Sequence, residues 1–157
     1  MPEPGSLRGS HPRKSLAHIF QFDSLQPPEG VVPPRGMMEL AVHTLGCKLN
    51  QAETSAVGES FREVGFEVVS LKEGGDVVFI NTCTVTERAD QECRKLVRRS
   101  LRVNPNAFVI VTGCYAQLQP EKIASIDGVD LVLGNAEKHR ALELAGDLTK
   151  RDTPYVV

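Results

Sequence analysis

The sequence predicts an α/β fold, with a mostly parallel sheet of about five strands, helices on both faces and a disordered N-terminal extension before it. Two observations support this prediction. From Met38 onward, short runs of β-branched residues alternate with longer amphipathic stretches. Glycine or proline also occurs where the long helices should end, at Gly65 and Pro105. This alternation is typical of a parallel sheet, because parallel strands need a crossover connection.

The predicted elements follow one another along a single domain. The strands are expected at residues 40–44, 66–70, 77–80, 108–112 and 131–133. The helices are expected at residues 52–64, 87–103, 119–125 and 136–145.

The two ends of the chain differ from this middle part. Residues 1–36 hold seven of the ten prolines and show no sustained period, which indicates a disordered extension; a start codon assigned upstream of Met37 explains them equally well. Residues 37–146 form the predicted domain. Residues 147–157 are predicted to be a linker toward a domain that is missing from this sequence.

Composition limits the possible functions. The formal net charge is −2, whereas a domain that binds nucleic acid by itself usually has a strong basic excess. There is no apolar run near the ~20 residues of a membrane span and no secretory leader, so we expect a cytoplasmic protein without a membrane partner. In a reducing compartment, four cysteines are more often metal ligands or redox groups than disulfides.

Three of these cysteines follow the ends of predicted strands. Cys47, Cys83 and Cys114 each come within a few residues of the carboxyl end of a strand. Because the carboxyl ends of parallel strands lie along one edge, where open α/β sheets bind their ligands, the three thiols should converge. Cys93 instead falls on the apolar stripe of the helix at 87–103 and is predicted to fill the core.

Three thiolates without an obvious fourth ligand suit an iron–sulfur cluster that leaves one iron open. Three alternatives remain. The cysteines could be buried structural thiols, or zinc ligands, although structural zinc usually has four ligands and a short-spaced pair. A nucleotide-binding domain with incidental cysteines is the third, although the sequence has neither GxGxxG nor a P-loop motif.

The segments around these cysteines resemble the three cysteine motifs of the methylthiotransferase N-terminal domain, in order and spacing. They read Thr44-Leu-Gly-Cys-Lys-Leu-Asn-Gln51, Asn81-Thr-Cys-Thr-Val-Thr86 and Val111-Thr-Gly-Cys-Tyr-Ala-Gln117. The resemblance implies a small α/β domain in which Cys47, Cys83 and Cys114 bind an auxiliary 4Fe-4S cluster. The wording of the first motif most resembles the branch that converts N6-threonylcarbamoyladenosine next to the tRNA anticodon to its 2-methylthio derivative.

The same resemblance implies parts that this sequence does not contain. In the family, S-adenosylmethionine and a second 4Fe-4S cluster belong to a radical SAM domain with a CxxxCxxC motif, which is absent here. We therefore expect no catalytic residue in this chain, no turnover by the chain alone, and tRNA as a substrate held mainly by the missing domains. A stand-alone iron–sulfur module for sulfur delivery or redox sensing is the alternative.

Several polar residues near the motifs are candidates for secondary roles. Asn50, Gln51 and Asn81 could contact substrate or support the cluster loops, although capping is the commoner role for an asparagine at a helix start. His43 is predicted to be a packing residue of the first strand. A basic strip on the helix at 87–103 could contact tRNA phosphates, but a solvated helix face is the favoured interpretation. The strip consists of Arg94, Lys95, Arg98, Arg99 and Arg102.

Overall fold

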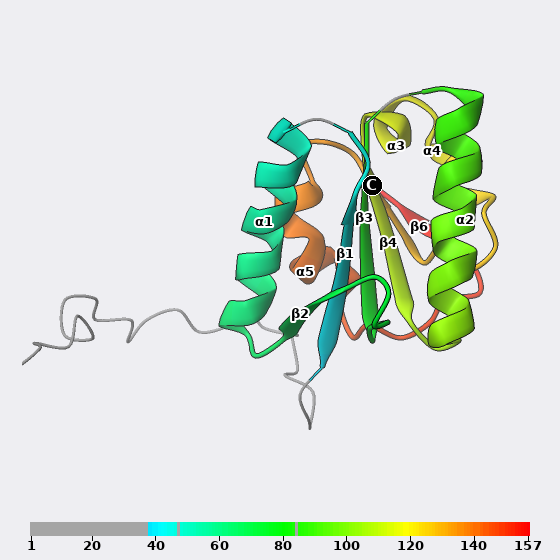
Figure 1. Cartoon of the computed structure of the whole chain (residues 1–157). Coiled ribbons are helices and arrows are strands. Elements are labelled where there is room, and N and C mark those ends of the chain that lie inside the picture. Colours follow the sequence, from blue (N-terminus) through cyan, green and yellow to red (C-terminus); the bar gives the residue numbers. More distant parts are fainter. Residues whose placement is uncertain (1–37, 47, 84) are drawn as a thin grey trace, which may run out of the picture.

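The computed structural model describes residues 38–46, 48–83 and 85–157. The predicted extension at 1–36, and Cys47 among the predicted ligands, lie outside these residues. Within the described part, six parallel strands form one sheet in the order β2-β1-β3-β4-β5-β6 (Figure 1). They are β1 Glu39–Thr44, β2 Glu67–Ser70, β3 Val77–Thr82, β4 Phe108–Gly113, β5 Leu131–Leu133 and β6 Tyr155–Val156. The predicted α/β class and parallel sheet are confirmed.

Helices cover both faces of the sheet, as predicted (Figure 1). One face packs against α1 (Lys48–Glu63) and α5 (Ala141–Ala145), through Val57, Phe61 and Ala141. The other face packs against α2 (Glu87–Val103), α3 (Cys114–Leu118) and α4 (Pro120–Ala124), through Val97 and Ile123. The central strands β3 and β4 are therefore buried along their whole length. This explains why they read as continuous apolar runs rather than as alternating patterns.

The helix boundaries depart from the prediction in three places. The first helix begins at Lys48 rather than at residue 52, because the Asn50 side chain donates a hydrogen bond back to the Leu45 carbonyl and ties the first turn to the β1 loop. Helix α3, which follows Gly113 directly, was not predicted. The helix predicted at 136–145 is instead a 3-10 turn, η2 (Lys138–Arg140), followed by the short α5.

The last residues of the chain contact the sheet. Lys150 forms an ion pair with the fully buried Asp130, at 2.7 Å between Nζ and Oδ2, and the backbone N–H of Arg151 donates to the same carboxylate. Tyr155 and Val156 then add β6 beside β5. The sheet thus has one strand more than the five predicted. In the described part of the chain, none of the helices has the length and apolar composition needed to span a membrane.

Candidate functional site

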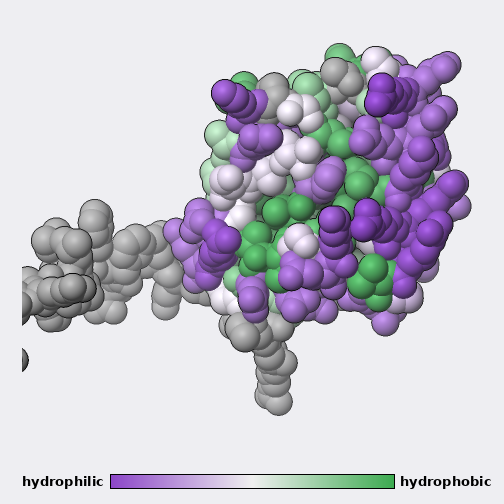
Figure 2. Space-filling view, viewed as in Figure 1, coloured by the Kyte–Doolittle hydropathy of each residue, from purple (hydrophilic) through white to green (hydrophobic). Residues whose placement is uncertain are grey.

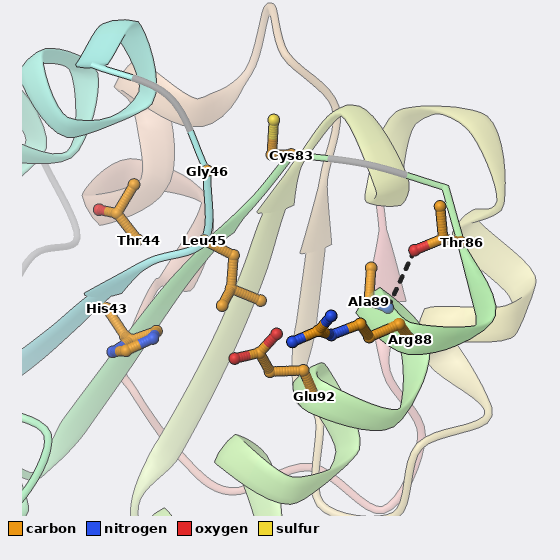
Figure 3. A pocket seen from close by; sticks show the side chains of 9 residues that line it. All are labelled: His43, Thr44, Leu45, Gly46, Cys83, Thr86, Arg88, Ala89 and Glu92. Atoms are coloured by element: carbon orange, nitrogen blue, oxygen red, sulfur yellow. Dashed lines mark hydrogen bonds between the residues drawn. The ribbon is translucent and has the colours of Figure 1, made fainter.

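The strand order places a crevice between the carboxyl ends of β1 and β3. These strands are neighbours, but the chain leaves β1 into α1 on one face and leaves β3 into α2 on the other. Their loops therefore diverge, and such a switch point is where open α/β sheets bind ligands. A pocket of about 470 Å³ lies there (Figure 3). It is lined by His43, Thr44, Leu45, Gly46, Cys83, Thr86, Arg88, Ala89 and Glu92.

Cys83 lies at this switch point, directly after β3, and is partly exposed. The loop after β1 packs closely against it at Gly46, which has a φ of +116°. A Cβ added to Gly46 would overlap the Cβ of Cys83 and lie 2.6 Å from its Sγ. Only glycine allows this approach and this backbone conformation. Gly46, which packs against Cys83, directly precedes Cys47, the first of the three predicted ligands.

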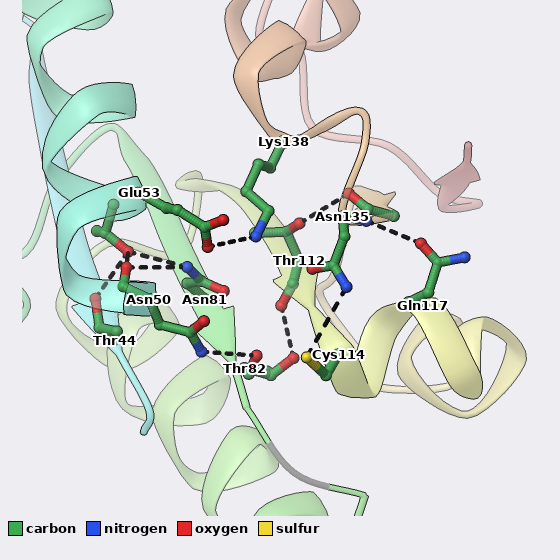
Figure 4. Close-up of polar contacts among 12 residues, drawn as sticks. Thr44, Asn50, Glu53, Asn81, Thr82, Thr112, Cys114, Gln117, Asn135 and Lys138 are labelled. Carbon is green, nitrogen blue, oxygen red and sulfur yellow. Dashed lines mark hydrogen bonds and ion pairs between the residues drawn. The ribbon is translucent and has the colours of Figure 1, made fainter. Parts of the chain in front are cut away.

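Cys83 and Cys114 follow two neighbouring strands, β3 and β4, at matching positions of their register. Thr82 and Gly113 are paired across these strands, and the two cysteines are the next residue of each chain segment. Gly113 has a φ of +103°, and a Cβ there would run into the Thr82 carbonyl oxygen. The Thr82 hydroxyl donates to the Thr112 carbonyl at 2.6 Å (Figure 4). Cys114 is partly exposed, like Cys83.

Asn50 and Asn81 hold the loops of this edge together. The Asn50 amide, on α1, donates to the carbonyl oxygens of Leu45 and Thr82, each at 3.3 Å. The Asn81 amide, at the end of β3, donates to the Asn50 carbonyl and to the Thr54 hydroxyl, each at 3.2 Å (Figure 4). Both asparagines are buried. Their contacts therefore fix the positions of the segments that carry the cysteines.

The remaining predicted polar residues are placed differently. Gln51 is exposed on α1, one residue beyond the buried Asn50. The buried carbonyl oxygen of the Asn81 side chain has no hydrogen-bond partner among the described residues. It lies next to Gly113, because a Cβ on that glycine would be 2.7 Å from it. His43 lines the pocket. Its pKa is lowered, mainly because burial disfavours the charged imidazole; the charge of Glu92 opposes this shift and the charge of Arg99 adds to it.

A second network fixes the start of α3 to α2. The Tyr115 hydroxyl donates to Asp90 at 2.7 Å, and the Arg94 Nε donates to the other oxygen of the same carboxylate at 2.9 Å. The bond from Arg94 is the largest cause that lowers the Asp90 pKa, and the Tyr115 bond adds to it. Because Tyr115 follows Cys114 in the chain, this network holds the third cysteine motif against α2, the helix that follows the Cys83 motif.

Cys93 is a core residue, which confirms its predicted role. It is 0% exposed and belongs, with Val97 and Val109, to the apolar core between α2 and the sheet. Burial, and secondarily the charge of Asp90, raise the pKa of its thiol to about 12. A thiol that stays protonated is a poor nucleophile and a poor metal ligand.

The structure adds one loop to the site that the cysteine pattern did not reveal. After β5, Asn135 donates from its side-chain amide toward the Cys114 Sγ at 3.9 Å, and its backbone N–H donates to Gln117 at 2.9 Å (Figure 4). Nearby, the buried Lys138 pairs with Glu53 of α1 at 2.6 Å. A sequence signal for Asn135 does exist. In Leu133-Gly134-Asn135 a glycine near the end of a strand directly precedes Asn135, just as Gly46 and Gly113 directly precede Cys47 and Cys114.

These features fit a thiolate-ligated metal cluster. Cys83 lies at the switch point and Cys114 follows the neighbouring strand β4, and both thiols are partly exposed. Two glycines allow a close backbone approach there, and an amide is directed at the Cys114 sulfur. Sulfur ligands and hydrogen bonds to sulfur are characteristic of iron–sulfur sites. Among the described residues no group of three potential ligands is present. The third predicted ligand, Cys47, lies outside them.

Fold and site together define the class of the domain: an α/β sheet with thiols at the carboxyl edge of its central strands. Comparisons with known proteins agree with this. The model of a family described as "Uncharacterized protein family UPF0004" matches residues 39–134. The threonylcarbamoyladenosine tRNA methylthiotransferase MtaB of Bacillus subtilis is 45% identical over 106 residues, which are 68% of this chain and 24% of the relative. The protein of the same name from Aquifex aeolicus is 42% identical over 120 residues, 76% of this chain and 29% of the relative.

A second branch is also similar to the chain. The tRNA-2-methylthio-N(6)-dimethylallyladenosine synthase of Methylacidiphilum infernorum is 33% identical over 127 residues, 76% of this chain and 27% of the relative. The chain thus spans about a quarter of the length of these curated relatives. The chain belongs to the methylthiotransferase N-terminal domain family, as its three motifs indicate.

Proposed function

We propose that this chain is the cluster-binding N-terminal domain of a tRNA methylthiotransferase that converts N6-threonylcarbamoyladenosine next to the anticodon to its 2-methylthio derivative. The observation that carries the proposal is that Cys83 follows β3 at the β1/β3 switch point and that Cys114 follows the neighbouring strand β4 at the matching position. The higher identity to the threonylcarbamoyladenosine relatives supports the choice of substrate.

In this proposal Cys47, Cys83 and Cys114 ligate an auxiliary 4Fe-4S cluster. When bound, the cluster would carry the sulfur that is inserted. The residues of the chain do the positioning. Asn50 and Asn81 hold the first two cysteine loops together, and the Tyr115–Asp90 bond holds the third. Asn135 donates toward the Cys114 sulfur, a contact of the kind that tunes iron–sulfur clusters.

The other components of the reaction lie outside this sequence. S-adenosylmethionine and the second 4Fe-4S cluster are proposed to belong to a radical SAM domain, and most of the tRNA contacts to domains beyond residues 1–157. A cytoplasmic location is part of the proposal, because thiols stay reduced there. Gln51, exposed on α1 near the site, remains a candidate for substrate contact.

A chimera tests the proposal. Residues 39–134 would replace the matching segment of the Bacillus subtilis relative, in a strain that lacks that relative. Nucleosides from hydrolysed tRNA would then be quantified by mass spectrometry. We expect the chimera to restore 2-methylthio-threonylcarbamoyladenosine, Cys83→Ala and Cys114→Ala chimeras to make none, and a Cys93→Ala chimera to retain it.

Two outcomes would count against the proposal. A folded chimera that contains iron but makes no product would contradict the methylthiotransferase function and favour a stand-alone iron–sulfur module. A Cys83→Ala chimera as active as the unmodified one would contradict the ligand assignment.

A further inference from the structure

The outer face of α2 carries a row of exposed basic side chains. Arg88, Lys95, Arg99 and Arg102 are spaced by seven, four and three residues, which places them on one side of the helix, and Arg98 lies beside them. We refer to these five residues as the basic face. From Arg88 to Arg102 the rise along the helix is about 21 Å. In Figure 2, hydrophilic residues cover the side of the molecule that α2 occupies in Figure 1.

The ion pairs of α2 leave this face uncompensated. A solvated helix face should show its arginines paired with acidic residues three or four positions away. Arg94 does pair with Asp90, at 2.9 Å, and the same carboxylate accepts a hydrogen bond from Tyr115, so we leave Arg94 out of the basic face. Within residues 38–46, 48–83 and 85–157, no ion pair involves any member of the basic face. Glu92 is the acidic residue that shares this side of the helix.

The basic face is continuous with the cysteine pocket. A second hollow, of about 410 Å³, is lined by Arg88, Gln91, Glu92 and Lys95. Arg88 and Glu92 also line the pocket that contains Cys83. Figure 3 shows both side chains extending from α2 toward β1, below Cys83. A polyanion lying along α2 would therefore lead directly to the proposed cluster.

We propose that the basic face binds the phosphate backbone of an RNA strand and guides it toward Cys83. The charge of the face is complementary to phosphate, and arginine suits phosphate because its guanidinium group can donate two parallel hydrogen bonds. The choice of RNA among polyanions rests on the proposed function. The overall charge of −2 means that binding must come from this local charge separation rather than from a net basic protein.

The test compares two variants with the same net charge. One neutralises the face with Lys95→Gln, Arg98→Gln, Arg99→Gln and Arg102→Gln, leaving Arg88 in the pocket intact. The matched control neutralises four exposed residues on other elements, with Arg62→Gln, Lys72→Gln, Lys122→Gln and Arg140→Gln. All eight positions are exposed, so both variants should fold, and circular dichroism with thermal unfolding checks this.

Binding of a labelled RNA stem-loop to the full chain is measured by fluorescence anisotropy at salt concentrations from about 50 to 200 mM. Binding through phosphate contacts is strongly weakened over this range: a protein with 6–10 such contacts loses about 10³–10⁵-fold in affinity.

We expect the face variant to lose at least about tenfold in affinity for the RNA. In a plot of log K against log[salt], the magnitude of its slope should be smaller by about 3, because each of the four lost phosphate contacts contributes about 0.7–0.9. The control variant should stay within about twofold of the unmodified chain. Equal losses in both variants, no loss in the face variant, or no RNA binding by the unmodified chain would overturn the proposal. Poly-glutamate that competes as well as unlabelled RNA would overturn the assignment to RNA and indicate an acidic protein partner.

Iron content separates this inference from the proposed function. The cluster is reconstituted in the same three proteins and its iron is measured. A chain that takes up no iron contradicts the proposed function, whereas iron uptake with unchanged RNA binding by the face variant contradicts only the inference drawn from α2.

Discussion

The middle of the sheet and its carboxyl edge are formed by the same strands but contain different residues. In the middle, Val78 and Ile110 are fully buried between two layers of helices. A few residues further along the same strands, Cys83 and Cys114 are partly exposed. There, buried asparagines and threonines fix the loops through specific hydrogen bonds. The middle is stabilised by apolar burial, whereas the structure of the edge depends on specific hydrogen bonds and on close backbone contacts at glycines. Cys93 on α2 packs against this apolar middle, whereas Cys83 and Cys114 at the edge are the proposed ligands.

The largest difference should come from glycine substitutions. Gly113→Ala, at the edge, adds a Cβ that runs into the Thr82 carbonyl oxygen at a φ of +103°, and we expect a loss of about 3–5 kcal/mol or failure to fold. Gly58→Ala, inside α1, places its Cβ 3.7 Å from Val68 and should gain about 0.5–1 kcal/mol. Urea unfolding of both variants measures this. Similar stabilities for the two would show that the edge is not tightly constrained.

The thiols should differ by orders of magnitude in reactivity. With a pKa of about 12, Cys93 is ionised in only about one molecule in ten thousand at pH 8, and it is also buried. Iodoacetamide should therefore label Cys83 and Cys114 of the cluster-free chain at least about a thousandfold faster than Cys93. Peptide mass spectrometry over time gives the three rates. Rapid labelling of Cys93 in the folded chain would contradict its placement in the core.

Replacement of the edge asparagine should cost more than a change in the neighbouring core. Asn81→Leu removes the donor to Asn50 and Thr54, and we expect a loss of about 2–3 kcal/mol. Ile80→Val, one position earlier on β3, should cost about 0.5–1.5 kcal/mol. Denaturant unfolding compares the two. An Asn81→Leu variant as stable as the unmodified chain would mean that the polar network does not hold the edge.

The smallest effect is expected at the link between α3 and α2. Tyr115→Phe removes one hydrogen bond to Asp90 and should cost about 1 kcal/mol at pH 7. Because Tyr115 helps to lower the Asp90 pKa below its ordinary 3.8, this difference should be full above that pH and should shrink as the pH falls through the lowered value, since a protonated carboxyl accepts a weaker hydrogen bond. Thermal unfolding of both proteins across the acid range measures it. A difference that does not change with pH would rule out Asp90 as the partner.

The sequence predicted the strands closely, because β3, β4 and β5 are apolar runs bounded by clear breaks. It also predicted that Cys83 and Cys114 would share an edge, since that follows from parallel topology alone. It did not predict the buried ion pair of Lys138 with Glu53, because these residues are 85 positions apart and no local pattern connects them. The short α3 was missed for a related reason: Tyr115 is held by its bond to the distant Asp90 rather than by local periodicity.

Anaerobic reconstitution with iron and sulfide tests most directly whether the strand-end thiols share one inorganic centre. We expect about four irons per chain in the unmodified protein and in Cys93→Ala, and loss of that iron in Cys47→Ala, Cys83→Ala and Cys114→Ala. Full iron content in any of the last three variants, or its loss in Cys93→Ala alone, would contradict this expectation.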